Sequence, residues 1–396
     1  MPEVAGKTAD PKNRNGAVEL LRILATFCIV FHHYQQLGGI YYTGGLNFYN
    51  GRFPFQYLVE LFFLLSGYLA YHYQKKIECG QSFFSFIRGR IVRLFPGMIL
   101  ADLACYALMY FYYRHFGTYW MEIPINKWKL LITLCGMGAG WFVPGTQING
   151  PTWYVSVLFL CLIVYFVLTK LAVRIGLPKE LFYAGMVILG VGGYLLAQVL
   201  MDSCGKTVEI PFWNVYSCRG YYAFFMGLLL AKKQKAGITG RFLGSFLAMS
   251  VLSLILFLLS PGTFLSWINI LLAIVIYPPF LLLLTSEKAA EKTLTWRVAA
   301  CFGRMSYNVY LWHVPLYMAL FVYLLRRNLY VDLTKPGVML VYGLLSWLFG
   351  IACYYLLELP LRKAVSALWR FRKALFWDVL FRKEEDTEED TPKNDN

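Results

Sequence analysis

The sequence predicts an all-α integral membrane protein, a polytopic bundle of about ten transmembrane helices with its N- and C-termini in the cytoplasm. Of the 396 residues, 58% are hydrophobic and only 15% are charged, and the mean hydropathy is +0.52, which excludes a soluble protein. Many of the 29 Tyr and 11 Trp residues flank long apolar runs, where amphipathic rings lie at the lipid headgroups. Because lipid cannot hydrogen-bond the backbone, these runs are expected to be helices.

The apolar runs divide the chain into three regions. Residues 1–16 are a polar cytoplasmic segment without a cleavable signal peptide, residues 17–362 form the membrane domain, and residues 363–396 form a cytoplasmic tail, disordered and acidic at its end. A further stretch, 129–143, is interrupted by three glycines, and we interpret it as interfacial or re-entrant. Ten stretches approach the ~20 apolar residues that a bilayer requires: 17–36, 54–74, 96–113, 152–172, 181–200, 218–232, 241–260, 265–284, 301–325 and 336–357.

The distribution of basic residues sets the orientation. With ten spans and the N-terminus inside, 28 of the 37 Lys and Arg residues fall on the cytoplasmic side, which is a positive-inside pattern. Counting 129–143 as a span would move 19 of those charges outside, so we exclude it. Topology and contact with anionic membrane lipid therefore explain the net charge of +15, and no nucleic-acid partner is predicted.

The nine cysteines form no recognisable metal or disulfide framework. No CxxC pair and no Cys/His spacing typical of zinc occurs, so we predict no metal and no bound cofactor. Cys204 and Cys218 fall in one outer loop, where a bridge between them is compatible with the spacing. The chain also lacks a GxxxxGK[ST] phosphate loop, which argues against an ATP-driven pump.

Ionisable residues in the first span indicate a functional face. Such a residue costs about 2.5 kcal/mol or more at mid-bilayer unless it is paired or functional. Arg22 and His33 are eleven residues apart, which places them on one helix face, about 16 Å apart along the axis. Arg22 then lies near the cytoplasmic end and His33 near the outer end, whereas His32 points about 100° away. Taken singly, each is also compatible with an interfacial role.

The second span adds a carboxylate and leads into a basic segment. Glu60 is expected at a depth near that of His33, either orienting its ring or held neutral by burial. Arg90 and Arg93 are neighbours on a helix that we expect to break at Pro96. Clustered guanidinium groups suit phosphate, although an ordinary topology anchor explains them better without further context.

The last two spans contain further candidates. Ser306, Tyr310 and His313 share one face of the ninth span, with His313 near the bilayer centre, as a functional or a hydrogen-bonded core residue. Glu358 and Arg362 follow at the cytoplasmic end of the tenth span, beside Pro360, which we expect to end the helix.

The start of the fourth span and the start of the sixth give weaker signals. For Trp153, Ser156 and Arg219, roles as aromatic belt and anchor suffice.

These motifs together resemble the acyltransferase 3 family, bacterial ten-span membrane enzymes that acylate glycans of the cell envelope. The resemblance runs from about residue 18 to 362. It implies that Arg22 and His33 are catalytic or essential, and that Arg90 and Arg93 handle an acyl-CoA donor. The motifs are the Arg22 and His33 spacing, ELFFLLSGYL at 60–69, the Arg90-x-x-Arg93 pair, TWYVSVL at 152–158, MSYNVYLWH at 305–313 and LELP at 357–360.

Two departures from the family pattern accompany the resemblance. An acidic residue is frequent in the fourth-span motif, where this chain has Ser156 and Val157. In addition, no SGNH-type hydrolase domain is fused to the membrane domain, which implies that acyl transfer is completed within the membrane domain itself.

The resulting hypothesis is a multi-pass enzyme of the bacterial inner membrane that moves an acyl group, acetyl most often in such families, from cytosolic acyl-CoA to a glycan hydroxyl outside. Arg90, Arg93 and Arg362 would bind the donor, and His33, Glu60 and Arg22 would be catalytic. The alternative is a transporter or flippase for a sugar or lipid-linked polysaccharide, in which the same residues form a substrate or proton pathway. The oligomeric state is left open.

Overall fold

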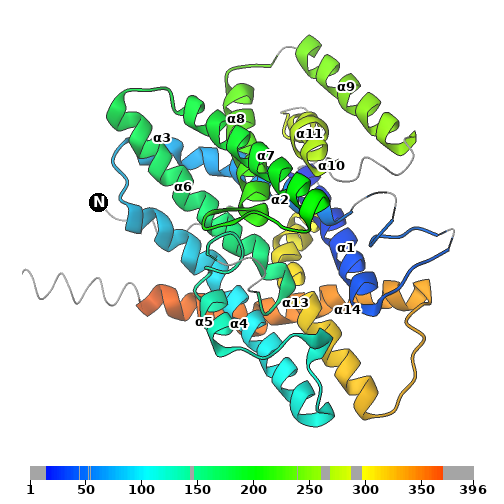
Figure 1. Ribbon diagram of the computed structural model, residues 1–396. Coiled ribbons are helices and arrows are strands. Elements are labelled where there is room, and N and C mark those ends of the chain that lie inside the picture. The colour runs from blue at the N-terminus through cyan, green and yellow to red at the C-terminus, as the bar shows by residue number, and fades with distance from the viewer. Residues whose placement is uncertain are drawn as a thin grey trace, which may run out of the picture.

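Most of the described residues lie in helices (Figure 1), which confirms the all-α prediction. The predicted N-terminal segment, up to residue 14, and the tail from residue 369 lie outside the part of the chain that is described. The computed structural model describes residues 15–43, 45–51, 53, 55–142, 147–238, 240–259, 268–286 and 297–368.

The longer helices coincide with the predicted apolar stretches, and short elements connect them. The helices are α1 (Gly16–Gly38), α2 (Leu58–Ala70), α3 (Gln74–Glu78), α4 (Phe83–Phe116), α5 (Lys127–Leu134), α6 (Trp153–Ile175), α7 (Lys179–Cys204), α8 (Val215–Lys235), α9 (Gly240–Leu259), α10 (Ile268–Leu271), α11 (Tyr277–Leu284), α13 (Arg297–Arg326) and α14 (Pro336–Cys353). Strands β1 (Glu209–Ile210) and β2 (Trp213–Asn214) form a small antiparallel hairpin before α8.

Six helical segments of the described chain are long and apolar enough to cross a membrane: Gly16–Gly38, Phe83–Phe116, Gly150–Ile175, Lys179–Cys204, Phe302–Arg326 and Pro336–Leu368. The chain is therefore a helical membrane protein. The remaining predicted spans contain helices too, but these are shorter or more polar, such as the 13 residues of α2. The number of about ten spans stays a prediction.

Two prolines that we expected to break helices lie inside helical segments instead. Helix α4 runs through Pro96 for 34 residues, so Arg90 and Arg93 belong to the same helix as the third span. The helix of the last span continues past Pro360 to residue 368. A π-helical turn at Tyr354–Glu358 precedes that proline. Such a turn leaves a carbonyl without its usual helical partner, and a proline without an N–H is tolerated there.

Small residues let the central helices approach closely. A Cβ atom at Gly67 of α2 would clash with the Phe224 carbonyl of α8, and one at Gly227 of α8 would clash with the Leu64 carbonyl of α2. The two backbones are therefore in direct contact, as is typical of membrane helices. This contact brings one face of α2, with Glu60, against α8.

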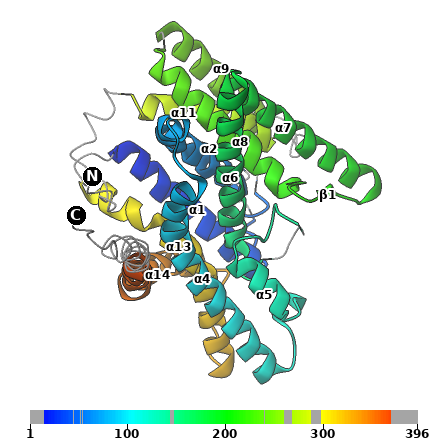
Figure 2. The same cartoon turned by 90° about the vertical axis from the view of Figure 1, so that its left-hand side faces the viewer.

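Helix α13 lies at the centre of a group formed with α1, α4 and α14. It packs against α1, α4 and α14, and α4 and α13 run side by side toward the lower end of both views (Figure 2). The rings of Phe27 and Trp347, 5.1 Å apart, join α1 to α14. On another face of α1, the Glu19 side chain lies against Gly303 of α13.

Residues 129–142, the described part of the segment 129–143, do not form a membrane-spanning helix. Helix α5 has only eight residues, and the chain then turns at Gly136 and Gly140, both with positive φ. The turn is buried against α6, where the Ser156 hydroxyl donates to the carbonyls of Gly136 and Ala139 at 3.1 and 3.0 Å. This geometry is consistent with our exclusion of the segment as a membrane span. Ser156 has a structural role, because it holds the turn against α6.

The bridge between Cys204 and Cys218 that the spacing would allow is not formed. Both thiols are free, with Cys204 exposed and Cys218 buried in α8.

Candidate active site

Three histidine rings meet near the C-terminal end of α1. The rings of His33 and His313 have centroids 5.2 Å apart, and the ring of His32 meets that of His33 edge-on at 5.1 Å. His313 is completely buried in α13. Its Nδ1 donates to the Val309 carbonyl at 3.2 Å, and its Nε2 has no hydrogen-bond partner. Tertiary packing thus joins His33 and His313, which the sequence placed on separate spans.

The tautomer of His33 is fixed by its neighbour Gln36. Nδ1 of His33 lies 2.9 Å from Oε1 of Gln36, one helical turn away. An amide oxygen can only accept, so Nδ1 carries the proton and Nε2 keeps its lone pair. A neutral imidazole oriented in this way can act as a base or a nucleophile.

His32 is more closely tied to this centre than its helical angle suggests. The side chain is buried, and its Nδ1 donates to the Phe48 carbonyl at 2.9 Å. Its ring also lies 5.3 Å from that of Tyr49. His32 therefore anchors the loop after α1 while it supports the edge of the His33 ring.

Arg22 lies on the same continuous helix as His33, as predicted from their spacing. Its Nη1 is 3.3 Å from Oε2 of Glu19, one turn earlier, and its side chain is 19% exposed. Arg22 and Arg93 both lie within electrostatic range of the Tyr154 hydroxyl in α6. The positive charges of Arg22 and Arg93 thus both act on Tyr154.

Aromatic ring contacts connect Tyr154 to the histidines. The ring of Tyr154 lies 5.8 Å from that of Tyr310, which lies 6.1 Å from His313. The Tyr310 hydroxyl donates to the Pro151 carbonyl at 2.7 Å, so the ring is fixed. Tyr310 and His313 therefore share a connected site, whereas the buried Ser306 hydroxyl bonds to the Gly303 carbonyl within its own helix.

Glu60 makes its hydrogen bonds to other residues than His33. Its fully buried carboxylate accepts from Arg219 Nε at 2.6 Å, from Arg219 Nη2 at 3.1 Å and from the Tyr222 hydroxyl at 3.2 Å. Of the two roles considered for Glu60, contact with the His33 ring is not observed, and Gln36 is the residue that hydrogen-bonds to that ring. Arg219, predicted as a simple anchor, is the ion-pair partner, and its guanidinium lies over the rings of Trp153 and Tyr57 at 4.7 and 5.2 Å.

The Arg90 guanidinium lies between two aromatic rings at the start of α4. Its Cζ is 3.8 Å from the ring centroid of Tyr73 and 3.9 Å from that of Phe86. Nη1 donates to the Phe86 carbonyl at 2.8 Å, while the buried Nη2 has no acceptor in the protein. Arg93, one turn further along, is exposed. A flat guanidinium held in this way is suited to an anionic ligand.

Glu358, in the π-helical turn before Pro360, is a buried acid. It is 1% exposed, and its Oε1 accepts from Arg362 Nη1 at 3.4 Å. Its Oε2 has no partner and lies against Gly97 of α4, next to Pro96. Arg93 is within electrostatic range of Glu358. The predicted donor residues Arg93 and Arg362 thus share one acidic neighbour.

Sequence reasoning overlooked a second buried acid, Asp102 of α4. It is fully buried, its Oδ1 accepts from the Thr152 hydroxyl at 3.1 Å, and its Oδ2 has no partner. The rule that drew attention to Glu60, a carboxylate inside an apolar run, applies equally to Asp102.

The described residues contain no group of three or more His, Cys, Asp and Glu side chains that could hold a metal ion.

Residues 15–357 match the family model described as an acyltransferase domain, that of acyltransferase 3. The chain belongs to the acyltransferase 3 family. No curated protein and no solved structure matches it. Membership of this family decides between the two function classes considered above: the protein is a membrane acyltransferase.

Proposed function

We propose that this acyltransferase moves an acyl group, acetyl in the simplest case, from cytosolic acyl-CoA to a hydroxyl of a cell-surface or lipid-linked glycan on the outer side of the bacterial inner membrane. The main support is the orientation of His33. Oε1 of Gln36 lies 2.9 Å from Nδ1 of His33, and the ring of His313 lies 5.2 Å away, tilted by 33°. A preorganised neutral imidazole is what acyl transfer to a hydroxyl requires.

Two routes for the acyl group are compatible with this geometry. In direct transfer, Nε2 of His33 accepts the proton as the glycan oxygen attacks the acyl carbonyl, the carbon–sulfur bond breaks, and the proton passes to the CoA thiolate. In the covalent route, Nε2 itself attacks the acyl carbonyl and CoA leaves as a thiolate; the glycan hydroxyl then displaces the imidazole, and its proton passes to the CoA thiolate. Both routes end with an acylated glycan and free CoA.

The donor side is supported by Arg90. Two rings hold its guanidinium, and its Nη2 has no protein acceptor, so the phosphates of CoA would complete its hydrogen bonds. Arg93 and Arg362 would add charge from the same region. The pantetheine arm would then pass Arg22 on its way to His33, along about 16 Å of α1.

The test of chemistry compares His33→Gln with His72→Gln, since His72 is exposed outside the site. Glycans from cells that express each variant would be analysed by mass spectrometry. Wild type and His72→Gln should add the mass of one acyl group, which also identifies the group. His33→Gln should lower the transfer rate about 10³-fold at equal membrane level, the scale of a lost general base. Unchanged transfer by His33→Gln would exclude the proposed role.

The test of sidedness uses sealed, right-side-out vesicles with labelled acetyl-CoA. Donor loaded in the lumen should label an acceptor glycan supplied outside, and donor added outside should not. Labelling that depends only on external donor would contradict the proposed path across the membrane.

A further inference from the structure

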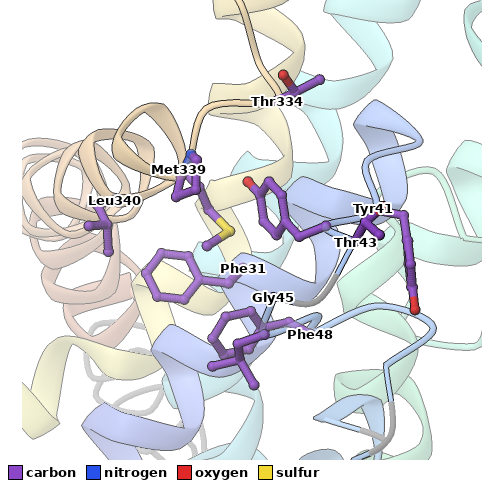
Figure 3. A pocket seen from close by; sticks show the side chains of 11 residues that line it. Phe31, Tyr41, Thr43, Gly45, Phe48, Thr334, Met339 and Leu340 are labelled. Atoms are coloured by element: carbon purple, nitrogen blue, oxygen red, sulfur yellow. The ribbon is translucent and has the colours of Figure 1, made fainter.

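The buried acid Asp102 lies in the interior of the protein and not in its open cavity. Phe31, Phe48 and Met339 form much of the wall of that cavity (Figure 3), and no charged residue and no histidine lines it. Asp102 lies instead near the middle of α4, against the short segment 149–152 that leads into α6.

The segment 149–152 is bound to α4 through one carboxyl oxygen. Oδ1 of Asp102 accepts from the Thr152 hydroxyl at 3.1 Å, and the backbone N–H of Asn149 also forms a hydrogen bond with Asp102. All three residues are 0–1% exposed. Asp102 and Asn149 are therefore direct neighbours in a buried environment.

The same segment is bound to α13 on its other side. The side-chain Nδ2 of Asn149 donates to the Leu311 carbonyl at 2.8 Å. The Pro151 carbonyl accepts from the Tyr310 hydroxyl at 2.7 Å. His313 follows on the next residues of this helix, and its ring meets that of His33. The segment thus links α4 to the turn of α13 that faces the candidate active site.

Two buried acceptors at this link have no donor. Because the Leu311 carbonyl can only accept, the amide nitrogen of Asn149 faces it, and Oδ1 of Asn149 is left without a partner. Oδ2 of Asp102 also has no partner. An ionised carboxylate has no hydrogen to donate, whereas a protonated carboxyl group has one O–H donor. One proton on Asp102 therefore removes both deficits.

The surroundings of Asp102 also favour the neutral acid. The buried carboxylate of Glu60 is paired with Arg219, but no ion pair among the described residues includes Asp102. The titratable side chains within electrostatic range are Cys105 of α4 and Tyr307 of α13, and neither can carry a positive charge. An unpaired buried carboxylate is costly, so such a group takes up a proton instead.

We propose that Asp102 carries a proton and donates it in a hydrogen bond to Asn149 Oδ1. Through the segment 149–152, Asp102 thereby acts as a positioning residue for Tyr310 and His313. The positioning role rests on the proposed function, because it concerns the ring that contacts His33 in that reaction. The protonation of Asp102 does not depend on the proposed function.

The experiment uses the full-length protein in lipid nanodiscs and compares two substitutions at one position. Asp102→Asn keeps the shape of the side chain, and its amide can accept from Thr152 and donate to Asn149. Asp102→Leu removes both functions. The matched control is Asp202→Asn, since Asp202 is exposed near the end of α7.

Infrared difference spectra test the proton directly. The spectrum of wild type minus Asp102→Asn should contain the C=O stretch of a protonated carboxyl group. The spectrum of wild type minus Asp202→Asn should contain only bands of an ionised carboxylate. Ionised-carboxylate bands in the Asp102 spectrum would overturn the proposal, because a water molecule or a cation would then have to complete the hydrogen bonds.

Kinetics and hydrogen exchange test the positioning role. Asp102→Asn should leave kcat unchanged, and Asp102→Leu should lower it about tenfold with an unchanged donor KM, since a displacement of about 1 Å costs up to about 100-fold in rate. Exchange of the backbone amide hydrogens of residues 147–156 should match wild type in Asp102→Asn and be faster in Asp102→Leu. Exchange needs no substrate, so it tests the link even if wild type transfers no acyl group, a result that would refute only the proposed function.

Two further results would overturn the proposal. An equal loss of kcat in Asp102→Asn and Asp102→Leu, at equal membrane level, would mean that the negative charge of Asp102 is required. Wild-type kcat and wild-type exchange in Asp102→Leu would mean that Asp102 does not position α13.

Discussion

Removing the charge of Glu60 should lower the free energy of unfolding without changing the rate of the chemical step. In Glu60→Gln, the carboxylate that accepts three hydrogen bonds is replaced by an amide, whose N–H₂ group faces the donors of Arg219. Breaking one partner of a buried ion pair costs about 3–5 kcal/mol. Arg219 keeps 15% side-chain exposure and its contacts with Trp153 and Tyr57. We therefore expect the lower end, about 3 kcal/mol.

The measurement is a double-mutant cycle of unfolding in mixed detergent micelles. Arg219→Gln alone should cost a similar amount, since it leaves the fully buried Glu60 carboxylate without its cation. The double variant should be less destabilised than either single variant, because neither charge is then left alone. The matched control is Glu78→Gln, whose ion pair with Lys179 is partly exposed and should be worth under about 1 kcal/mol.

Two outcomes would refute this argument. Additive losses in the double variant would mean that Glu60 and Arg219 do not stabilise each other. A folded, fully inserted double variant with no transferase activity would restore the catalytic role that the sequence suggested for Glu60.

Three further predictions follow from the geometry. His32→Ala should lower kcat about tenfold, because the loop and the His33 ring lose a support, and an unchanged kcat would contradict this. Arg90→Lys should raise the acyl-CoA KM about tenfold with little change in kcat, since lysine is a poor replacement at a stacked, multidentate site, whereas the exposed Arg88→Lys should leave both unchanged. Partial burial is the largest single influence on the pKa of Glu78 and by itself raises it, but the hydrogen bonds from Lys179 and Gln74 and the charge of Lys179 together outweigh burial and lower the pKa. The stability from the Glu78–Lys179 pair is present above the unfolded pKa of about 4.3 and is lost as the pH falls through the folded pKa, so Lys179→Met should reduce the change of stability over that range in unfolding measured against pH.

Several properties of this protein follow from local sequence alone. The apolar runs predicted where the helices lie, because a backbone in lipid has to satisfy its own hydrogen bonds. The eleven-residue spacing of Arg22 and His33 fixed their shared face, since α1 is one continuous helix. The glycines within 129–143 indicated that this stretch is interfacial or re-entrant, and the positive φ angles of Gly136 and Gly140 do not fit a continuous helix.

Other local signals were misleading because a helix end also depends on its neighbours. Pro96 and Pro360 both indicate breaks in isolation. In the folded chain, α4 continues through the first, and a π-helical turn accommodates the second. The consequence is functional, since Arg90 and Arg93 then lie on the same rigid helix as the third span.

The pairing of the polar residues was decided by tertiary structure. Glu60 finds both its partners, Arg219 and Tyr222, on α8, far along the chain. His33 meets His313 only because α1 packs against α13. A sequence shows which buried charges and rings need partners, but each need is compatible with many partners. Tertiary packing selects the partners, through the close contact of α2 and α8 at Gly67 and the packing of α13. Side chains in a packed bundle reach only the groups that their backbones bring within a few ångströms.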